Sequence, residues 1–235
     1  MDSSLLTGLF VWYAVFLFST SLHEASHAVV SAWGGDYTAY NSGQATLNPL
    51  PHMQRERWGM IIAPLVSYFL FRGDWMLGWA SAPFNPHWAA RYPKKAFFMS
   101  LAGPLSHLIP ATFAFVVMLI GMRSGWFILG FLEGSRYLVA PADAGNSMMA
   151  AVCMLLHVLF TLNIVLLVFN LLPIPPMDGS EFWYLFIKRE EDRLRWRYNV
   201  HSYNMAGVLL AWYVFPKVFH FIYTFMIRFL IYLSY

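Results

Sequence analysis

The sequence HEASH contains two histidines, His23 and His27, four residues apart, with Glu24 directly after the first. On a helix this spacing places both imidazoles on one face, about one turn apart, where they can bind the same metal ion. Glu24 would then lie beside the ion, where a general base is needed to activate water. The motif indicates a hydrolytic metal centre, and a structural polar cluster or a chance match is the alternative interpretation.

A catalytic zinc ion usually takes three protein ligands and a water, so a third ligand is needed. The single cysteine, Cys153, lies in an apolar stretch, so histidine and carboxylate are the expected ligand types. Asp178, in NLLPIPPMDG (residues 170–179), is an acid in apolar surroundings and is the best candidate. Its alternative role is to cap a helix that begins at Gly179, which is a common position for Asp.

The composition indicates where this chemistry takes place. The chain is 59% hydrophobic and 11% charged, whereas an average soluble domain has about 25% charged residues. The net charge of +3 suits membrane orientation better than nucleic-acid binding. Four apolar stretches are long enough for the ~20 residues that a helical crossing needs: residues 5–32, 96–122, 147–172 and 205–232. We expect an integral, multi-pass membrane protein in which residues 1–235 form a single domain and the first span is retained.

The segment between the first two spans contains pieces that do not suit a full crossing. Residues 58–71 are apolar but short and contain Pro64, as expected of a re-entrant or interfacial segment. GQATLNPLPHM (43–53) and GWASAPFNP (78–86) are rich in Gly, Pro and Asn, so we expect short strands or turns there. The predicted fold class is an all-α polytopic membrane protein. It is a bundle of about four full transmembrane helices with a re-entrant or short helical segment and short membrane-associated β-strands.

The basic residues predict the orientation. If residues 58–71 do not cross, eleven Lys and Arg residues lie on one side of the membrane and two, Arg123 and Arg136, on the other. The positive-inside rule makes the richer side cytoplasmic and places the N-terminus outside. We expect a plasma-membrane location with the active site toward the cytoplasm. The eleven residues are Arg55, Arg57, Arg72, Arg91, Lys94, Lys95, Lys188, Arg189, Arg193, Arg195 and Arg197.

This topology also tests the metal site. The first and third spans both run toward the cytoplasmic side, so His23, His27 and Asp178 approach the same face of the membrane. A crossing at residues 58–71 would place the histidines and Asp178 on opposite sides, beyond the reach of zinc–ligand distances of about 2 Å. The charge count and the requirement for a shared metal therefore favour the same model.

Four motifs now occur in a specific order: HEASHA, GQATLNP, LAGPLSH (101–107) and FNLLPIPPMDG (169–179). In this order they resemble the site-2 protease family of intramembrane zinc metalloproteases, peptidase family M50, and specifically its compact members without a PDZ domain. The resemblance covers about residues 15–185. HExxH paired with NxxPxPxxDG is far more specific than either motif alone.

The resemblance implies a function and a site. One Zn²⁺ per chain would be held by His23, His27 and Asp178, with Glu24 as the catalytic base. The substrate would be a transmembrane segment of another protein, received in an extended form by residues 43–86. The expected partners are thus a membrane-protein substrate and the lipid bilayer, without nucleic acid, and the sequence does not determine the oligomeric state.

Other polar residues have weaker assignments. His107, at the opening of the second span, stands where the family commonly has Asn and is a candidate donor to the substrate or to an oxyanion; a packed helix-end histidine is the alternative. Asn163 and Asn170 in the third span are interpreted as interhelical hydrogen bonds before substrate contacts. His52 is expected to face solvent, and the KREEDRLRWR run (188–197) to be a solvated segment near lipid headgroups.

Two other functions compete with proteolysis. Intramembrane His and Asp residues can also form the ion pathway of a zinc carrier, but the sequence offers one clustered site and no second set of ionisable residues leading outward. A catalytically inactive relative could bind membrane helices without cutting them, but Glu24 and the three proposed ligands are all present. Proteolysis is therefore the favoured prediction.

Overall fold

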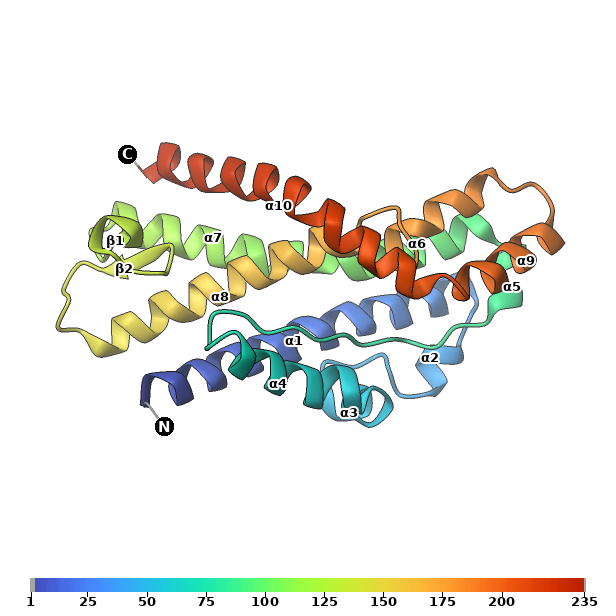
Figure 1. Cartoon of the computed structure of the whole chain (residues 1–235), viewed down its shortest axis with the longest axis horizontal. Coiled ribbons are helices and arrows are strands. Elements are labelled where there is room, and N and C mark those ends of the chain that lie inside the picture. Colours follow the sequence, from blue (N-terminus) through green and yellow to red (C-terminus); the bar gives the residue numbers. More distant parts are fainter. Residues whose placement is uncertain (1–2, 235) are drawn as a thin grey trace.

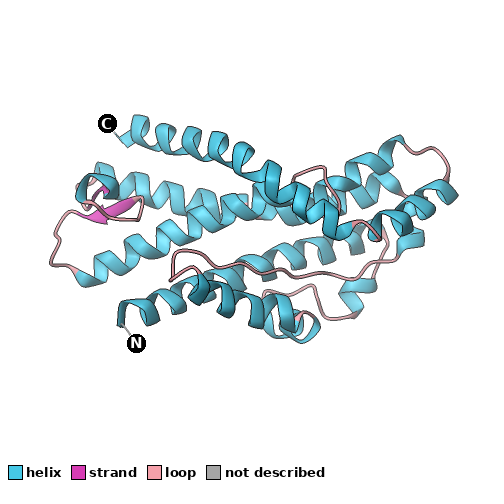
Figure 2. Cartoon of the chain, in the orientation of Figure 1, coloured by secondary structure: helices cyan, strands magenta, loops and turns pink. Residues whose placement is uncertain are grey.

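The computed structural model describes residues 3–234, which form an elongated bundle of long helices with two short strands at one end (Figures 1 and 2). The elements in chain order are α1 (Ser3–Gly34), α2 (Thr38–Asn41), α3 (Pro49–Arg55), η1 (Trp58–Ile62), α4 (Ala63–Leu70), α5 (Pro86–Arg91), α6 (Pro93–Ser106), α7 (Leu108–Arg123), β1 (Phe127–Leu129), η2 (Gly130–Glu133), β2 (Val139–Pro141), α8 (Ser147–Asn170), η3 (Asp178–Phe186), α9 (Glu190–His201) and α10 (Asn204–Ser234).

Four helical stretches are long and apolar enough to cross a membrane: Leu5–Gly34, Pro93–Arg123, Ser147–Asn170 and Asn204–Ser234. They agree with the four predicted spans. A continuous helix suits a membrane crossing because it satisfies its backbone hydrogen bonds internally in lipid. Successive spans run in opposite directions, so both ends of the chain lie at the end of the molecule that carries β1 and β2 (Figure 1). The chain is an integral membrane protein.

The second span consists of two helices, α6 and α7, which meet at His107. Pro104 and Pro110 have no amide hydrogen, so each removes a main-chain hydrogen bond close to this junction. The amide of His107 donates to the carbonyl of Pro104 at 3.2 Å, three residues back instead of four. The junction lies near the middle of the span and not at its opening, where we expected His107.

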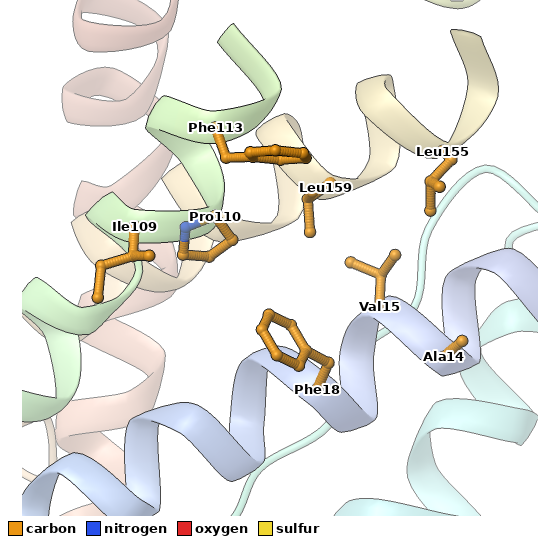
Figure 3. Close-up of a pocket in the computed structure, with 8 residues that line it drawn as sticks. All are labelled: Ala14, Val15, Phe18, Ile109, Pro110, Phe113, Leu155 and Leu159. Atoms are coloured by element: carbon orange, nitrogen blue, oxygen red, sulfur yellow. The ribbon is translucent and has the colours of Figure 1, made fainter. Parts of the chain in front are cut away.

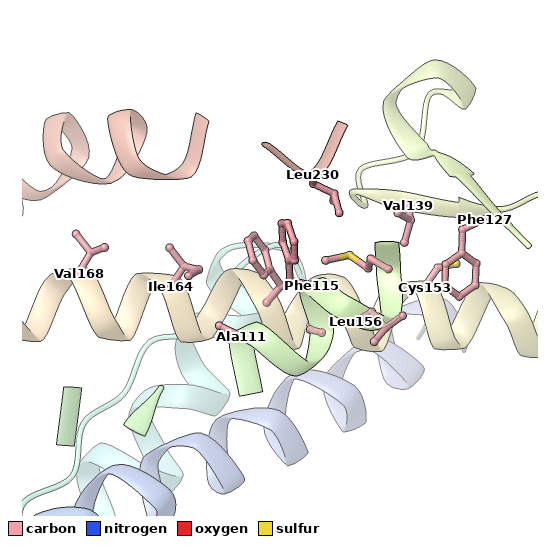
Figure 4. Packing of buried hydrophobic residues seen from close by; sticks show 12 residues of the cluster. Ala111, Phe115, Phe127, Val139, Cys153, Leu156, Ile164, Val168 and Leu230 are labelled. Carbon is pink, nitrogen blue, oxygen red and sulfur yellow. The ribbon is translucent and has the colours of Figure 1, made fainter. Parts of the chain in front are cut away.

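The main apolar core lies between α7, α8 and α10, and it is closed at the strand end by β1 and β2 (Figure 4). Phe115 of α7 packs against Phe160 of α8 and Phe229 of α10, with ring centroids 6.2 and 5.9 Å away. Cys153 is buried in this core as a free thiol, far from any ligand role. This core packs α8 against α7 and α10.

Residues 58–85 form a hairpin beside α1. Its helical arm, η1 and α4, ends in a turn at Arg72 and Gly73, and the chain returns through residues 75–85 without regular structure (Figure 2). The return arm is held by single contacts, such as the amide of Trp79 on the carbonyl of Gly59 at 3.1 Å. The chain thus enters and leaves this segment at the same end of the molecule, as in a re-entrant path.

The tip of this hairpin reaches the end of the molecule that carries β1 and β2, whereas we expected Arg72 on the opposite side. The hydroxyl of Tyr68 donates to the carbonyl of Leu5 at 2.8 Å, and Asp74 pairs with Arg136 at 2.8 Å. Arg72 therefore lies with Arg136 at the strand end. Moving this one residue changes the charge count from eleven and two to ten and three, which retains the bias.

The region 43–86 contains no strand, which corrects our expectation of membrane-associated strands there. Asn48 accepts from the amide of Leu50 at 3.1 Å, and Asn85 accepts from the amide of His87 at 2.9 Å. Each asparagine is followed by proline, which suits the first position of a helix because the amide there has no intrahelical partner. In residues 3–234 the strands are β1 and β2, which pair antiparallel.

Candidate metal centre

Three side chains from distant parts of the chain converge. The Nε2 atoms of His23 and His27, both on α1, are 2.9 Å apart. Oδ2 of Asp178, at the start of η3, lies 3.1 Å from the first and 3.4 Å from the second. Ligands about 2 Å from a tetrahedral zinc ion are roughly 3.3 Å from one another. The three atoms therefore occupy positions suited to one shared metal ion.

The backbone around Asp178 directs its carboxylate to the histidines. η3 has no side-chain cap, so Asp178 does not take the alternative capping role. Its carbonyl accepts from the hydroxyl of Ser100 on α6 at 2.9 Å. A Cβ on Gly179 would overlap the carbonyl of Leu171, so only glycine fits after Asp178. Oδ2 of this carboxylate faces Nε2 of both imidazoles.

The orientation of His27 is fixed by α6. Its Nδ1 lies 2.7 Å from the carbonyl of Met99. A carbonyl only accepts, so Nδ1 carries a proton, and in the neutral ring Nε2 then presents a lone pair to the site. This lone pair, the carboxylate of Asp178 and Nε2 of His23 all face one another, and such a set is repulsive unless a cation lies between them. The donor set of two imidazoles and one carboxylate fits zinc.

The helix α6 also passes close over the site. A Cβ at Gly103 would overlap Nε2 of His27 and press against Nε2 of His23. Glycine therefore allows the α6 backbone to approach the two histidines. In LAGPLSH we assigned a role only to His107. The glycine of this motif was also informative, because glycine allows the backbone to approach another group closely.

Glu24 lies in the same buried setting. This residue is 4% exposed, and its Oε2 has no hydrogen-bond partner among the described residues. A buried carboxylate oxygen without a partner is costly unless water or substrate contacts it. This is the setting that a general base next to the metal requires.

The structure places His107 behind His23 and not facing the site. Its Nε2 is 3.0 Å from Nδ1 of His23, and its Nδ1 is 2.8 Å from Oδ1 of Asn163. Both ring nitrogens are thus used by protein groups, and His107 has no free donor for a substrate or an oxyanion. Asn163 also bonds Ser19 of α1 at 3.0 Å, so it is an interhelical contact.

Two other predicted residues lie apart from the centre. Asn170 donates to the carbonyl of Leu166, one turn back in α8, at 2.9 Å. No contact found within residues 3–234 links its side chain to the three converging residues. The expectation that His52 faces solvent is wrong, because it is 1% exposed and its Nε2 lies 2.9 Å from the carbonyl of Thr46.

The helix α9 holds the element that carries Asp178. The guanidinium of Arg197 makes two bonds to the carboxylate of Glu181, at 2.8 and 3.0 Å. It also lies over the rings of Tyr184 and Phe84, 4.3 and 4.9 Å from their centroids. The run that we read as a solvated segment therefore fastens η3 to the end of the hairpin.

An apolar pocket of about 420 Å³ opens between α1, α7 and α8 (Figure 3). None of the converging residues lines it, so it is separate from the candidate centre. Its walls carry only apolar side chains, as expected for a hollow within the membrane-spanning part. The lining residues are Ala14, Val15, Phe18, Ile109, Pro110, Phe113, Leu155 and Leu159.

Comparisons with known proteins point to a peptidase family. The family model for peptidase family M50 matches residues 11–214. "Putative zinc metalloprotease YwhC" of Bacillus subtilis (strain 168) is 34% identical over 166 residues, which cover 68% of this chain and 62% of that protein. The match thus spans less than two thirds of the relative's length. No solved structure matches the chain.

Proposed function

The chain belongs to peptidase family M50, and from this premise we propose that it is an intramembrane zinc endopeptidase of the site-2 type. Its substrates are transmembrane segments of other proteins. One observation carries the proposal: Asp178, from the segment after the third span, lies within 3.4 Å of His23 and His27 of the first span, with Glu24 buried beside them.

The residues divide into metal holding and proton transfer. His23, His27 and Asp178 would hold Zn²⁺, one ion per chain. When bound, this ion lowers the pKa of a water from ~15.7 towards ~7 and polarises the scissile carbonyl. Glu24 takes a proton from the attacking water at its carboxylate and delivers it to the leaving nitrogen. The unpartnered Oε2 of Glu24 supports this role, because it is an acceptor with no competing donor.

A transmembrane substrate must be locally unwound before it is cut, because a helix hides its peptide bonds in i→i−4 hydrogen bonds. Residues 75–85 are irregular and have no strand partner within the described chain. Their backbone is suited to pair with an extended peptide. Arg197 joins this arm, through Phe84, to the element that carries Asp178.

The proposal includes an orientation. With Arg72 moved to the strand end, the predicted topology puts ten of the thirteen Lys and Arg residues outside the predicted spans on the side opposite β1 and β2. The positive-inside rule assigns this richer end to the cytoplasm. We place the chain in the plasma membrane with the metal centre opening toward that side.

The test uses the purified full chain in lipid vesicles with a panel of transmembrane peptides, and mass spectrometry maps the products. The wild type and the exposed control Glu190→Gln should cleave, and a zinc chelator should stop both. Glu24→Gln should lose cleavage and keep near-stoichiometric zinc, whereas Asp178→Ala should also lose zinc. Substantial cleavage by Glu24→Gln would exclude it as the base.

The same experiment separates the competing functions. Zinc that crosses the vesicle membrane without peptide cleavage would indicate a carrier. Peptides that bind to the wild type and leave intact would indicate an inactive helix-binding relative. Unchanged zinc affinity in Asp178→Ala would remove this residue from the ligand set.

A further inference from the structure

Behind the metal centre, hydrogen bonds join Asn163, His107 and His23. The donor and the acceptor of each bond can be assigned in turn, starting from Asn163. Nδ2 of Asn163, on α8, lies 2.7 Å from the carbonyl of Leu159 and 3.0 Å from Oγ of Ser19. A carbonyl only accepts, so the amide nitrogen must be the atom that faces it. Oδ1 of Asn163 is thereby turned toward His107, 2.8 Å from Nδ1.

The direction continues through His107 to the metal ligand. Oδ1 of Asn163 only accepts, so Nδ1 of His107 carries a proton, and Nε2 of the neutral ring has a lone pair. This Nε2 lies 3.0 Å from Nδ1 of His23, which must then be the donor. With its proton on Nδ1, neutral His23 presents the Nε2 lone pair toward Asp178 and His27, where the proposed metal ion would bind.

The opposite tautomer would abolish this arrangement. If Nε2 of His107 carried the proton, Nδ1 of His23 would have to accept the hydrogen bond and would carry no proton itself. The proton of neutral His23 would then be on Nε2, at the position that the metal ion needs. His23, His107 and Asn163 are 7%, 1% and 0% exposed, so water does not supply a substitute partner. His27 obtains the same orientation from a backbone carbonyl, whereas His23 depends on side chains alone.

We propose that His107, itself oriented by Asn163, is a positioning residue that holds His23 in its metal-binding tautomer. This inference rests on the proposed metal site and replaces a direct role of His107 toward the substrate. The groups that hydrogen-bond the other ring nitrogen of a ligating histidine are worth about 10–100-fold in metal affinity. The Asn163 amide sets the direction of all these hydrogen bonds, because its own orientation is fixed by the α8 backbone.

The experiment measures zinc affinity by competition with a chelator in the purified full chain without substrate, so its outcome is independent of whether any peptide is cut. His107→Leu removes the acceptor, and Asn163→Leu removes the group that selects the tautomer of His107. Both should weaken zinc binding by about 10–100-fold. His107→Gln should restore much of the affinity, since a glutamine amide oxygen reaches about as far from the backbone as Nε2.

A matched control is available on the same helix. Asn170, like Asn163, donates to the carbonyl four residues before it, but it lies away from His107. Asn170→Leu should therefore leave zinc affinity unchanged. The absorption bands of the cobalt(II)-loaded protein provide a second readout, because they report ligand geometry. His107→Leu and Asn163→Leu should alter these bands, and His107→Gln should return them toward the wild type.

Three results would overturn the inference. Wild-type zinc affinity and cobalt bands in His107→Leu would show that His23 needs no partner. Lost affinity in His107→Leu without any recovery in His107→Gln would indicate a packing role. Lost cleavage with unchanged zinc affinity would return His107 to a role toward the substrate.

Discussion

Replacing Arg197 with methionine tests whether α9 holds the element that carries Asp178. The change keeps most of the side-chain volume and removes both hydrogen bonds to Glu181, whose side chain is 10% exposed. Removing one partner of a buried ion pair costs ~3–5 kcal/mol, because the other charge is left uncompensated. Since 17% of the Arg197 side chain reaches solvent, we expect the lower end, about 3 kcal/mol of unfolding free energy.

The penalty should depend on pH in a defined direction. Burial raises the pKa of Glu181 above its ordinary 4.5, and Arg197 opposes this. Without Arg197 the pKa rises further. A group whose pKa is higher in the folded than in the unfolded state stabilises the fold below the unfolded pKa and loses this contribution as the pH rises through the folded value. The penalty should be smallest near pH 4.5 and grow as the pH increases.

The assay is thermal unfolding of the metal-free protein in detergent between pH 4.5 and 8. Arg189→Met is the matched control, because its pair with Asp192 is largely exposed and is worth at most ~1 kcal/mol. Combining Arg197→Met with Glu181→Gln should recover much of the loss, since no buried charge is then left unpaired. If Arg197→Met lowers the stability no more than Arg189→Met does, or if its penalty shrinks as the pH rises, the idea that Arg197 holds η3 against α9 is refuted.

Two further predictions concern the site and the path of the chain. Gly103→Ala should abolish zinc binding in the purified protein, because the added Cβ overlaps the imidazole of the second motif histidine; full zinc content would show that the close approach of α6 is unnecessary. In a Cys153→Ser background, a cysteine at His87 should react with a membrane-impermeant reagent from one side, and cysteines at Arg72 and Ser135 from the other. Same-side labelling of His87 and Arg72 would mean that the hairpin tip does not reach the strand end.

The parts of the fold that follow from local pattern were predictable. The four spans follow from apolar runs long enough to satisfy their own backbone, and the pairing of His23 with His27 follows from helical spacing. Asp178 needed the topology as well, because it is distant in sequence. The stretches that contain Asn48 and Asn85 were read as short strands or turns, since an Asn-Pro pair is typical of both turns and helix starts, and only the following residues decide between them.

The supporting contacts of the site could not be read in this way. His107 and His23 are 84 residues apart, and their contact depends on how α6 and α1 pack. Arg197 lies in a run of charged residues that resembles a solvated surface, and its buried partner is visible only when α9 folds back on η3. Such contacts depend on the relative placement of helices, which hydrophobic periodicity does not specify.

The junction at His107 divides the second span between two sets of neighbours. Its first half, α6, packs on α1 and η3 and supplies Met99 and Gly103 to the metal centre, whereas its second half, α7, packs on α8, α10 and β1. Helices bend most readily where prolines remove backbone bonds. The compliance of this span is thus located beside the metal ligands and not among them.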